Sequence, residues 1–193
     1  MPKDRNPQSK KSKESSKAGD NVRPNETGKP ARTRHATEAV DALTLLEADH
    51  REVDDLFDAF EEASGDAEQR DIARSICVAL KVHARLEEEL FYPAVWPALE
   101  DKSLIAEAMV EHASARDLIA QIESGAPGEA FFSARVRVLS EYVRHHVEEE
   151  EEEIFPQVRK GKLDLAALGE LLARRKAELM TGFAVSNPVL ALS

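Results

Sequence analysis

Two blocks with nearly the same residue pattern, far apart in the chain, constrain its fold more than any other feature. They read His83-x3-Glu87-Glu88-x2-Phe91-Tyr92-Pro93 and His146-x3-Glu150-Glu151-x2-Ile154-Phe155-Pro156. In each block a glutamate follows a histidine by four residues, which on an α-helix is about one turn further along the same face. The pattern predicts two related helices, each with a histidine and a carboxylate side by side.

A single histidine precedes each block at nearly the same distance. His50 lies 33 residues before His83, and His112 lies 34 residues before His146. The chain therefore repeats one unit twice, in which a helix with one histidine is followed by a helix with the His-x3-Glu pattern.

The surrounding residues predict helix almost throughout. Aromatic residues make up only 5% of the chain, and the helix-favouring Ala, Leu, Glu and Arg dominate from Thr37 onward. Glycine and proline positions predict helices at about 37–63, 66–92, 101–124, 129–155 and 164–180, the second and fourth ending at Pro93 and Pro156. The short connections predict an all-α, up-down-up-down antiparallel four-helix bundle, with a short additional C-terminal helix on its outside or capping one end.

Each long helix has an apolar stripe with steps of three and four residues, and each stripe contains one histidine. His50 lies 16 residues before the turn at Asp66 and His83 lies 17 residues after it, so the two reach a similar height in the bundle. We therefore expect six side chains to converge near the middle of the bundle: His50, His83, Glu87, His112, His146 and Glu150.

A metal ion would account for this group. One histidine in an apolar stripe is more often a hydrogen-bonded core residue than a ligand, but four at one height favour a shared ligand role. Buried carboxylates are costly unless they are paired or bound to metal. Imidazole and carboxylate donors favour iron, although manganese and zinc accept the same donors.

The glutamate run 148–153 is longer than one helical turn, so part of it must face solvent. We expect Glu148, Glu149 and Glu152 to do so, and His145 to lie outside the centre. The sequence leaves open whether Glu150 or Glu151 lies between the metals.

Charge divides the chain into parts. Residues 1–36 contain ten Lys and Arg against four Asp and Glu, and we predict a disordered basic tail there; residues 37–193 contain sixteen against thirty-three. The anionic body, predicted as a bundle at 37–160 with a C-terminal helix and tail at 161–193, argues against nucleic-acid binding by the folded domain. The tail is either a solubilising linker or a weak electrostatic attachment to nucleic acid or another anionic surface.

Two further features bear on the compartment. No apolar run is long enough to span a membrane, and no signal peptide is visible, so we expect a cytoplasmic protein without a membrane partner. The single cysteine, Cys77, lies in an apolar stretch and is predicted to be a buried packing residue.

The two blocks and the two single histidines resemble the hemerythrin-like family of HHE cation-binding domains, over about residues 40–160. The resemblance implies a di-iron centre with an oxo or hydroxo bridge, in which four histidines are terminal ligands and two glutamates bridge: His50, His83, His112, His146, Glu87 and Glu150. Ferritin-like helices carry Glu-x-x-His instead, which disfavours ferritin-type storage.

The chain departs from oxygen-carrying members of that family. They have a further histidine where this chain has Ala108, and their last ligand is an aspartate five residues after its histidine, where this chain has Glu151. The missing histidine leaves a position for water, for Glu107 or Glu111, or for an exogenous ligand. This favours sensing of, or reaction with, oxygen, peroxide or nitric oxide, as in a stress response, or iron handling, over reversible oxygen carriage.

Two alternative functions belong to other classes of protein. One is an enzyme with peroxide- or nitric-oxide-directed activity at the same centre, although the sequence offers no additional acid or base group. The other is a helical scaffold that recruits a partner through its basic tail or acidic surface.

Overall fold

A computed structural model describes residues 40–186, and within this part every regular element is helical. The predicted basic tail at 1–36 and the last residues, 187–193, lie outside the described residues. The elements in chain order are α1 (Ala42–Glu62), α2 (Asp66–Leu86), η1 (Glu87–Phe91), α3 (Tyr92–Val95), η2 (Trp96–Ala98), α4 (Ser103–Ser124), α5 (Phe132–Glu149), η3 (Glu150–Ile154), α6 (Phe155–Lys160) and α7 (Leu165–Ser186).

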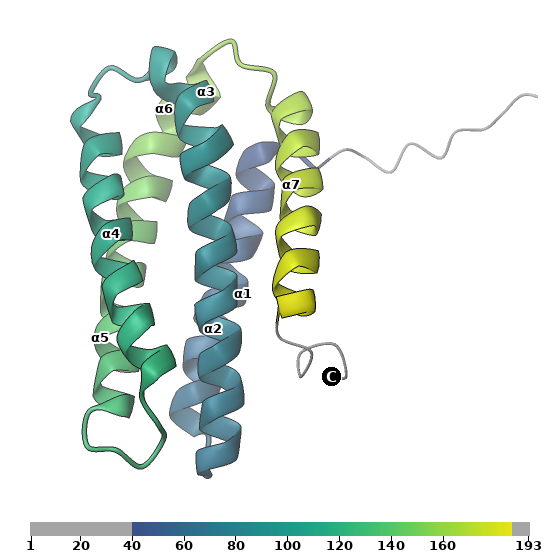
Figure 1. The fold of residues 1–193 in the computed structure, drawn as a ribbon. Coiled ribbons are helices and arrows are strands. Elements are labelled where there is room, and N and C mark those ends of the chain that lie inside the picture. The colour runs from purple at the N-terminus through teal and green to yellow at the C-terminus, as the bar shows by residue number, and fades with distance from the viewer. Residues whose placement is uncertain (1–39, 187–193) are drawn as a thin grey trace, which may run out of the picture. The chain divides into compact units, whose positions relative to one another are not determined.

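The long helices form the antiparallel bundle that the sequence predicts. α1 pairs with α2 and α4 pairs with α5, while α1 also contacts α5 and α2 contacts α4 (Figure 1). α7 runs along the outside of the bundle against α1 and α2, and it continues past its predicted end at Met180 to Ser186. The all-α bundle with an additional outer helix is thus confirmed, and no helix of residues 40–186 has the length and hydropathy of a membrane span.

The predicted helix ends at Pro93 and Pro156 are wrong, because the chain passes through both prolines in helical conformation. A single π turn precedes each: the Tyr92 N–H donates to the Glu87 carbonyl, and the Phe155 N–H donates to the Glu150 carbonyl. In a regular α-helix each proline ring would press on the carbonyl oxygen four residues earlier. The wider π turn avoids that contact, so the helix continues as α3 or α6.

Two helix starts also differ from the prediction. α1 begins at Ala42, with Asp41 as its N-cap, rather than at about Thr37. α5 begins at Phe132 rather than near Glu129, because the connection from α4 includes a turn with Gly128 at φ +87°. The Phe132 N–H donates to the Glu129 carbonyl, 3.1 Å away, and closes this connection.

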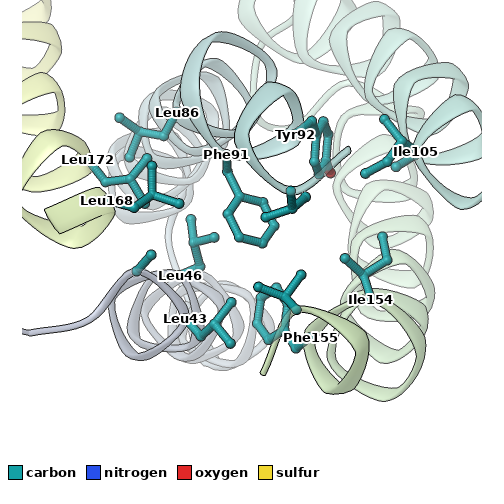
Figure 2. Packing of buried hydrophobic residues seen from close by; sticks show 14 of the residues in the cluster. Leu43, Leu46, Leu86, Phe91, Tyr92, Ile105, Ile154, Phe155, Leu168 and Leu172 are labelled. Carbon is teal, nitrogen blue, oxygen red and sulfur yellow. The ribbon is translucent and has the colours of Figure 1, made fainter. Parts of the chain in front are cut away.

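The core consists of two apolar clusters at different heights. The first core cluster contains the start of α1, residues within and after the π turns, and one face of α7. It includes Leu43, Leu46, Phe91, Tyr92, Phe155, Leu168 and Leu172 (Figure 2). The second core cluster lies nearer the α1–α2 and α4–α5 turns, and includes Val53, Phe57, Phe60, Leu80, Ile119, Phe132 and Leu139. Cys77 is buried in this second cluster, as predicted.

Close packing of α7 on α1 depends on a glycine. A Cβ atom at Gly169 would lie 2.9 Å from the Ala42 amide nitrogen and would collide with the Val40 carbonyl. The start of α1 therefore approaches the backbone of α7 more closely than any side chain would permit.

Candidate metal centre

Side chains from four helices meet between the two core clusters. His50 of α1 and His83 of α2 place their Nε2 atoms 3.1 Å apart. His112 of α4 and His146 of α5 place theirs 3.2 Å apart. Each histidine lies between residues of the first and second core clusters along its own helix. The centre is therefore a polar layer built from two histidine pairs, one from each helical hairpin.

Two glutamates at the start of the π turns lie beside these pairs. Glu87 Oε1 is 3.0 Å from His83 Nε2, and its Oε2 is 3.3 Å from His112 Nε2, so one carboxylate contacts both pairs. Glu150 Oε2 is 3.4 Å from His50 Nε2. The fold thus brings together all six residues that the sequence suggests as ligands, and none is more than 7% exposed.

The outer nitrogens of the two single histidines are held by carboxylates from the opposite hairpin. His50 Nδ1 donates to Glu151 Oε1 at 2.7 Å, and His112 Nδ1 donates to Glu88 Oε1 at 3.0 Å. Each acceptor directly follows the central glutamate of its block. Glu150 therefore lies in the centre while Glu151 faces outward, which separates the two residues that the sequence left open.

The other two histidines face carboxylates of their own hairpin. His146 Nδ1 donates to Glu111 Oε2 at 2.9 Å. His83 Nδ1 lies 3.7 Å from Asp49 Oδ2, an electrostatic contact longer than a hydrogen bond. Asp49 is in turn held by Lys176 of α7, whose Nζ donates to Oδ1 at 2.6 Å. Through Lys176, the outer helix α7 therefore contacts the carboxylate that faces His83.

The sequence reasoning missed the role of these four supporting carboxylates: it named Glu111 and Glu151 only as possible metal ligands and did not single out Asp49 or Glu88. Asp49 and Glu111 each directly precede a single histidine, and Glu88 and Glu151 each directly follow a central glutamate. The signal was therefore present in both repeats. The sequence shows an acidic residue beside each single histidine and beside each central glutamate, but only the structure shows which imidazole each carboxylate faces.

The arrangement of donors and acceptors fits a bound cation. A Nδ1–H that donates outward leaves the Nε2 lone pair directed inward, toward another Nε2 at close distance. Both carboxylate oxygens of Glu87 and of Glu150 are buried without a hydrogen-bond partner. Buried polar atoms are rarely left unpaired in native proteins. A cation between these atoms would pair all of them.

The pKa values also show that the buried carboxylates lack enough positive charge around them. Burial lowers the pKa of His83, but the carboxylates of Glu87 and Asp49 outweigh burial and raise it to about 10. Burial raises the pKa of Glu87, yet His83 and His112 hold it well below its usual range. Burial and the neighbouring Glu87 raise the pKa of Glu150. The metal-free centre thus needs protons where a metal would supply positive charge.

The two halves of the centre are not equivalent. Donor atoms of one group lie within 4.8 Å of one another and come from His50, His83, Glu87 and Glu150. The second such group contains only Glu87, His112 and His146. Glu87 belongs to both. The second group has one protein donor fewer, and its two histidines lie on the hairpin that carries Ala108.

Neither acidic residue near Ala108 completes the second group. Glu107 is exposed, and Glu111 is occupied with the outer nitrogen of His146. His145 also lies outside the centre, where its Nε2 is 3.4 Å from Glu149 Oε1 on the surface. Glu148 and Glu152 are exposed as expected, whereas Glu149 is half-buried.

Tyr92 is a further residue at the centre. Its ring stacks on the His112 imidazole with 5.8 Å between the ring centres. Its buried hydroxyl has no hydrogen-bond partner. Burial raises the pKa of Tyr92 well above its usual range, and the carboxylates of Glu87 and Glu150 raise it further. The hydroxyl therefore remains protonated and able to donate.

The bundle and its buried histidine-carboxylate layer define a helical cation-binding domain. The family model of the hemerythrin HHE cation binding domain matches residues 41–158, which is more than half of the chain, and the chain belongs to this family.

One solved structure agrees with the fold, and one curated protein is similar in sequence. The crystal structure of a hemerythrin HHE cation binding domain-containing protein from Mycobacterium kansasii superposes with a TM-score of 0.67 at 24% identity, covering 77% of this chain and 93% of that one. At this identity the likeness concerns the fold alone. A DNA nickase from Nostoc sp. is 29% identical over 115 residues, which are 60% of this chain and 32% of that protein. The chain therefore spans about a third of the length of this curated relative.

Proposed function

We propose that this protein is a non-haem di-iron protein of the hemerythrin type that senses or reacts with oxygen, peroxide or nitric oxide. The observation that carries the proposal is the set of four buried carboxylate oxygens, on Glu87 and Glu150, that have no partner beside two close pairs of imidazole nitrogens. Nitrogen and oxygen donors in this mixture suit iron.

The two donor groups assign the residues to two metal positions. His50, His83, Glu87 and Glu150 would hold the first iron, and Glu87, His112 and His146 would hold the second. Glu87 would be shared by both positions, whereas Glu150, which the resemblance implies as a second bridge, belongs to the first donor group only. Bound iron would supply redox chemistry and a position for a small ligand. The second position has fewer protein donors, so we assign the exogenous ligand to it.

The protein side chains would then control access and protonation. Apolar residues of both core clusters border the layer, and its six side chains are buried. The Tyr92 hydroxyl is buried at the centre without a partner and would donate a hydrogen bond to a bound ligand.

Metal analysis of the purified protein tests the proposal. We expect two irons per chain after anaerobic loading with Fe(II), followed by a charge-transfer spectrum on exposure to oxygen. Replacement of Glu87 with alanine should remove iron from both positions, and Glu150→Ala should weaken the first position more. Helicity should survive both changes, since packing of the apolar stripes supports the bundle. Glu152→Ala, an exposed change in the same π turn as Glu150, is the control.

The outcome that contradicts the proposal is a well-folded protein that binds no iron under these conditions. A protein that binds zinc or manganese alone would keep the cation site but overturn the redox role. Peroxide consumption no faster than that of free iron would exclude the enzyme version of the proposal.

The scaffold alternative makes the opposite prediction in cells. If the basic residues 1–36 recruit a partner, deleting them should abolish function, while His50→Ala should leave it intact. The di-iron proposal predicts that His50→Ala abolishes function. The nicking activity of the Nostoc relative is not carried over, because the match covers 32% of that protein and the body of this chain is anionic.

A further inference from the structure

A cavity of about 550 Å³ borders the histidine layer. All four central histidines line it, and from them it extends toward the second core cluster, where Val53, Leu80 and Ile119 form its walls. Any molecule in this cavity would therefore lie against apolar side chains on one side and against the metal centre on the other.

Short side chains on two facing helices create this space. Ala84 of α2 and Ala115 of α4, both half-buried, line the cavity at positions where larger residues would narrow it. Ala115 belongs to the apolar stripe of α4, whose next member is Ile119. Exposed side chains such as Arg116 and Tyr142 also line the cavity, so it opens to solvent and a ligand can enter it.

The volume exceeds what the small ligands of the proposed function require. A water molecule accounts for about 30 Å³ of liquid volume, and a diatomic gas or peroxide is of similar size. Pockets for organic molecules typically measure about 300–1,000 Å³. The cavity therefore has the size of a pocket for an organic molecule.

Of the three Lys and Arg side chains that line the cavity, two are paired with carboxylates, and the third, Arg85, is exposed. Lys81 donates to Glu123 at 2.5 Å, and Arg116 donates to Glu88 at 2.5 Å, so two ion pairs connect α2 and η1 to α4 beside the cavity. A charged ligand at either pair would have to displace one of these partners. An uncharged ligand would meet apolar walls without disturbing them.

We propose that this cavity binds an uncharged, apolar organic molecule, of the size of a small aromatic compound, directly beside the metal centre. This deepens the proposed function by naming the class of molecule that the centre would act on or sense. The binding site itself is formed by protein side chains, so it is testable with and without iron.

Naphthalene is a suitable probe, because it is uncharged, apolar and fluorescent. We expect saturable binding of one naphthalene per chain in both metal-free and iron-loaded full-length protein. Ala115→Leu fills the cavity and should weaken this binding at least tenfold, with iron content and helicity retained. Ala113→Leu places the same side chain at an exposed position of α4 and should leave naphthalene binding, iron content and helicity unchanged.

Ala84→Leu fills the same cavity from α2 and serves if Ala115→Leu does not fold. Saturable binding that both leucine variants leave unchanged would overturn the inference, as would wild-type protein that binds iron but no naphthalene. Protein that binds naphthalene but no iron would overturn the proposed function and leave the cavity assignment in place. The two failures are therefore distinguishable.

Discussion

The orientation of three of the four imidazoles is set by a hydrogen bond to a carboxylate that does not touch the centre. Glu151 illustrates this, because its carboxylate accepts from His50 Nδ1 although it belongs to the opposite hairpin. Such a partner fixes the tautomer and increases the basicity of the inward nitrogen.

Replacing Glu151 with glutamine should therefore weaken iron binding without removing a ligand. We expect a loss of about 10- to 100-fold in affinity, the range typical for partners of metal-bound histidines. Competition with a chelator measures it. Glu152→Gln removes the same charge from the neighbouring exposed residue. Equal losses in the two variants would show that general charge, rather than the hydrogen bond to His50, is responsible.

Cys77 provides a prediction with a defined pH dependence. Burial raises the pKa of its thiol to about 12, so at pH 8 only about one molecule in ten thousand carries the reactive thiolate. The folded protein should resist thiol reagents at pH 8 and react fully once denatured. Below pH 12 in the folded state, the rate should rise about tenfold with each pH unit. Rapid labelling of folded protein at pH 7 would contradict this environment.

At the scale of the element, the π turns show what the sequence could not reveal. The spacing of histidine, glutamate and proline predicted two equivalent helices, and both exist. A proline was expected to end each helix, because a regular helix cannot accommodate its ring. The chain widens one turn instead, at Glu87 and again at Glu150. Such turns occur frequently at functional sites, and here each begins at a central glutamate.

Docking of α7 can be tested with two glycines of that helix. At Gly169 a Cβ atom would collide with the backbone before α1, so Gly169→Ala should lower the free energy of unfolding by about 1–3 kcal/mol. At Gly182 a Cβ atom meets nothing within 4 Å, so Gly182→Ala should be neutral or should stabilise by up to about 1 kcal/mol through helix propensity. Thermal denaturation distinguishes them. Similar effects of both changes would show that α7 does not pack as described.

At the scale of the whole molecule, the polar layer separates two apolar clusters that each pack without it. The metal-free protein should therefore stay helical, and iron should add stability by binding only the folded state. At a free metal concentration 1,000 times the dissociation constant the gain is about 4 kcal/mol, or about 10 °C in melting temperature. Calorimetry with and without a chelator measures it. Complete loss of helicity on chelation would show that the metal holds the fold.

Much of this architecture could be predicted because the spacing of apolar residues and the positions of glycine and proline are features of the local sequence. The stripe of α1, with Leu43 and Phe57 on one face, is buried as expected. Contacts between hairpins are not local, so the role of Glu151 was invisible. The length of α7 was also underestimated, because the helix continues through Gly182 to Ser186.

The crossed support of the single histidines has a consequence for how the centre forms. The first hairpin contributes His50, whose carboxylate partner lies on the second, and the second contributes His112, whose partner lies on the first. Neither hairpin alone contains an oriented set of donors. Metal affinity would therefore report on assembly: a chain opened between the two hairpins, in the connection around Glu100, would acquire iron only when its two fragments recombine.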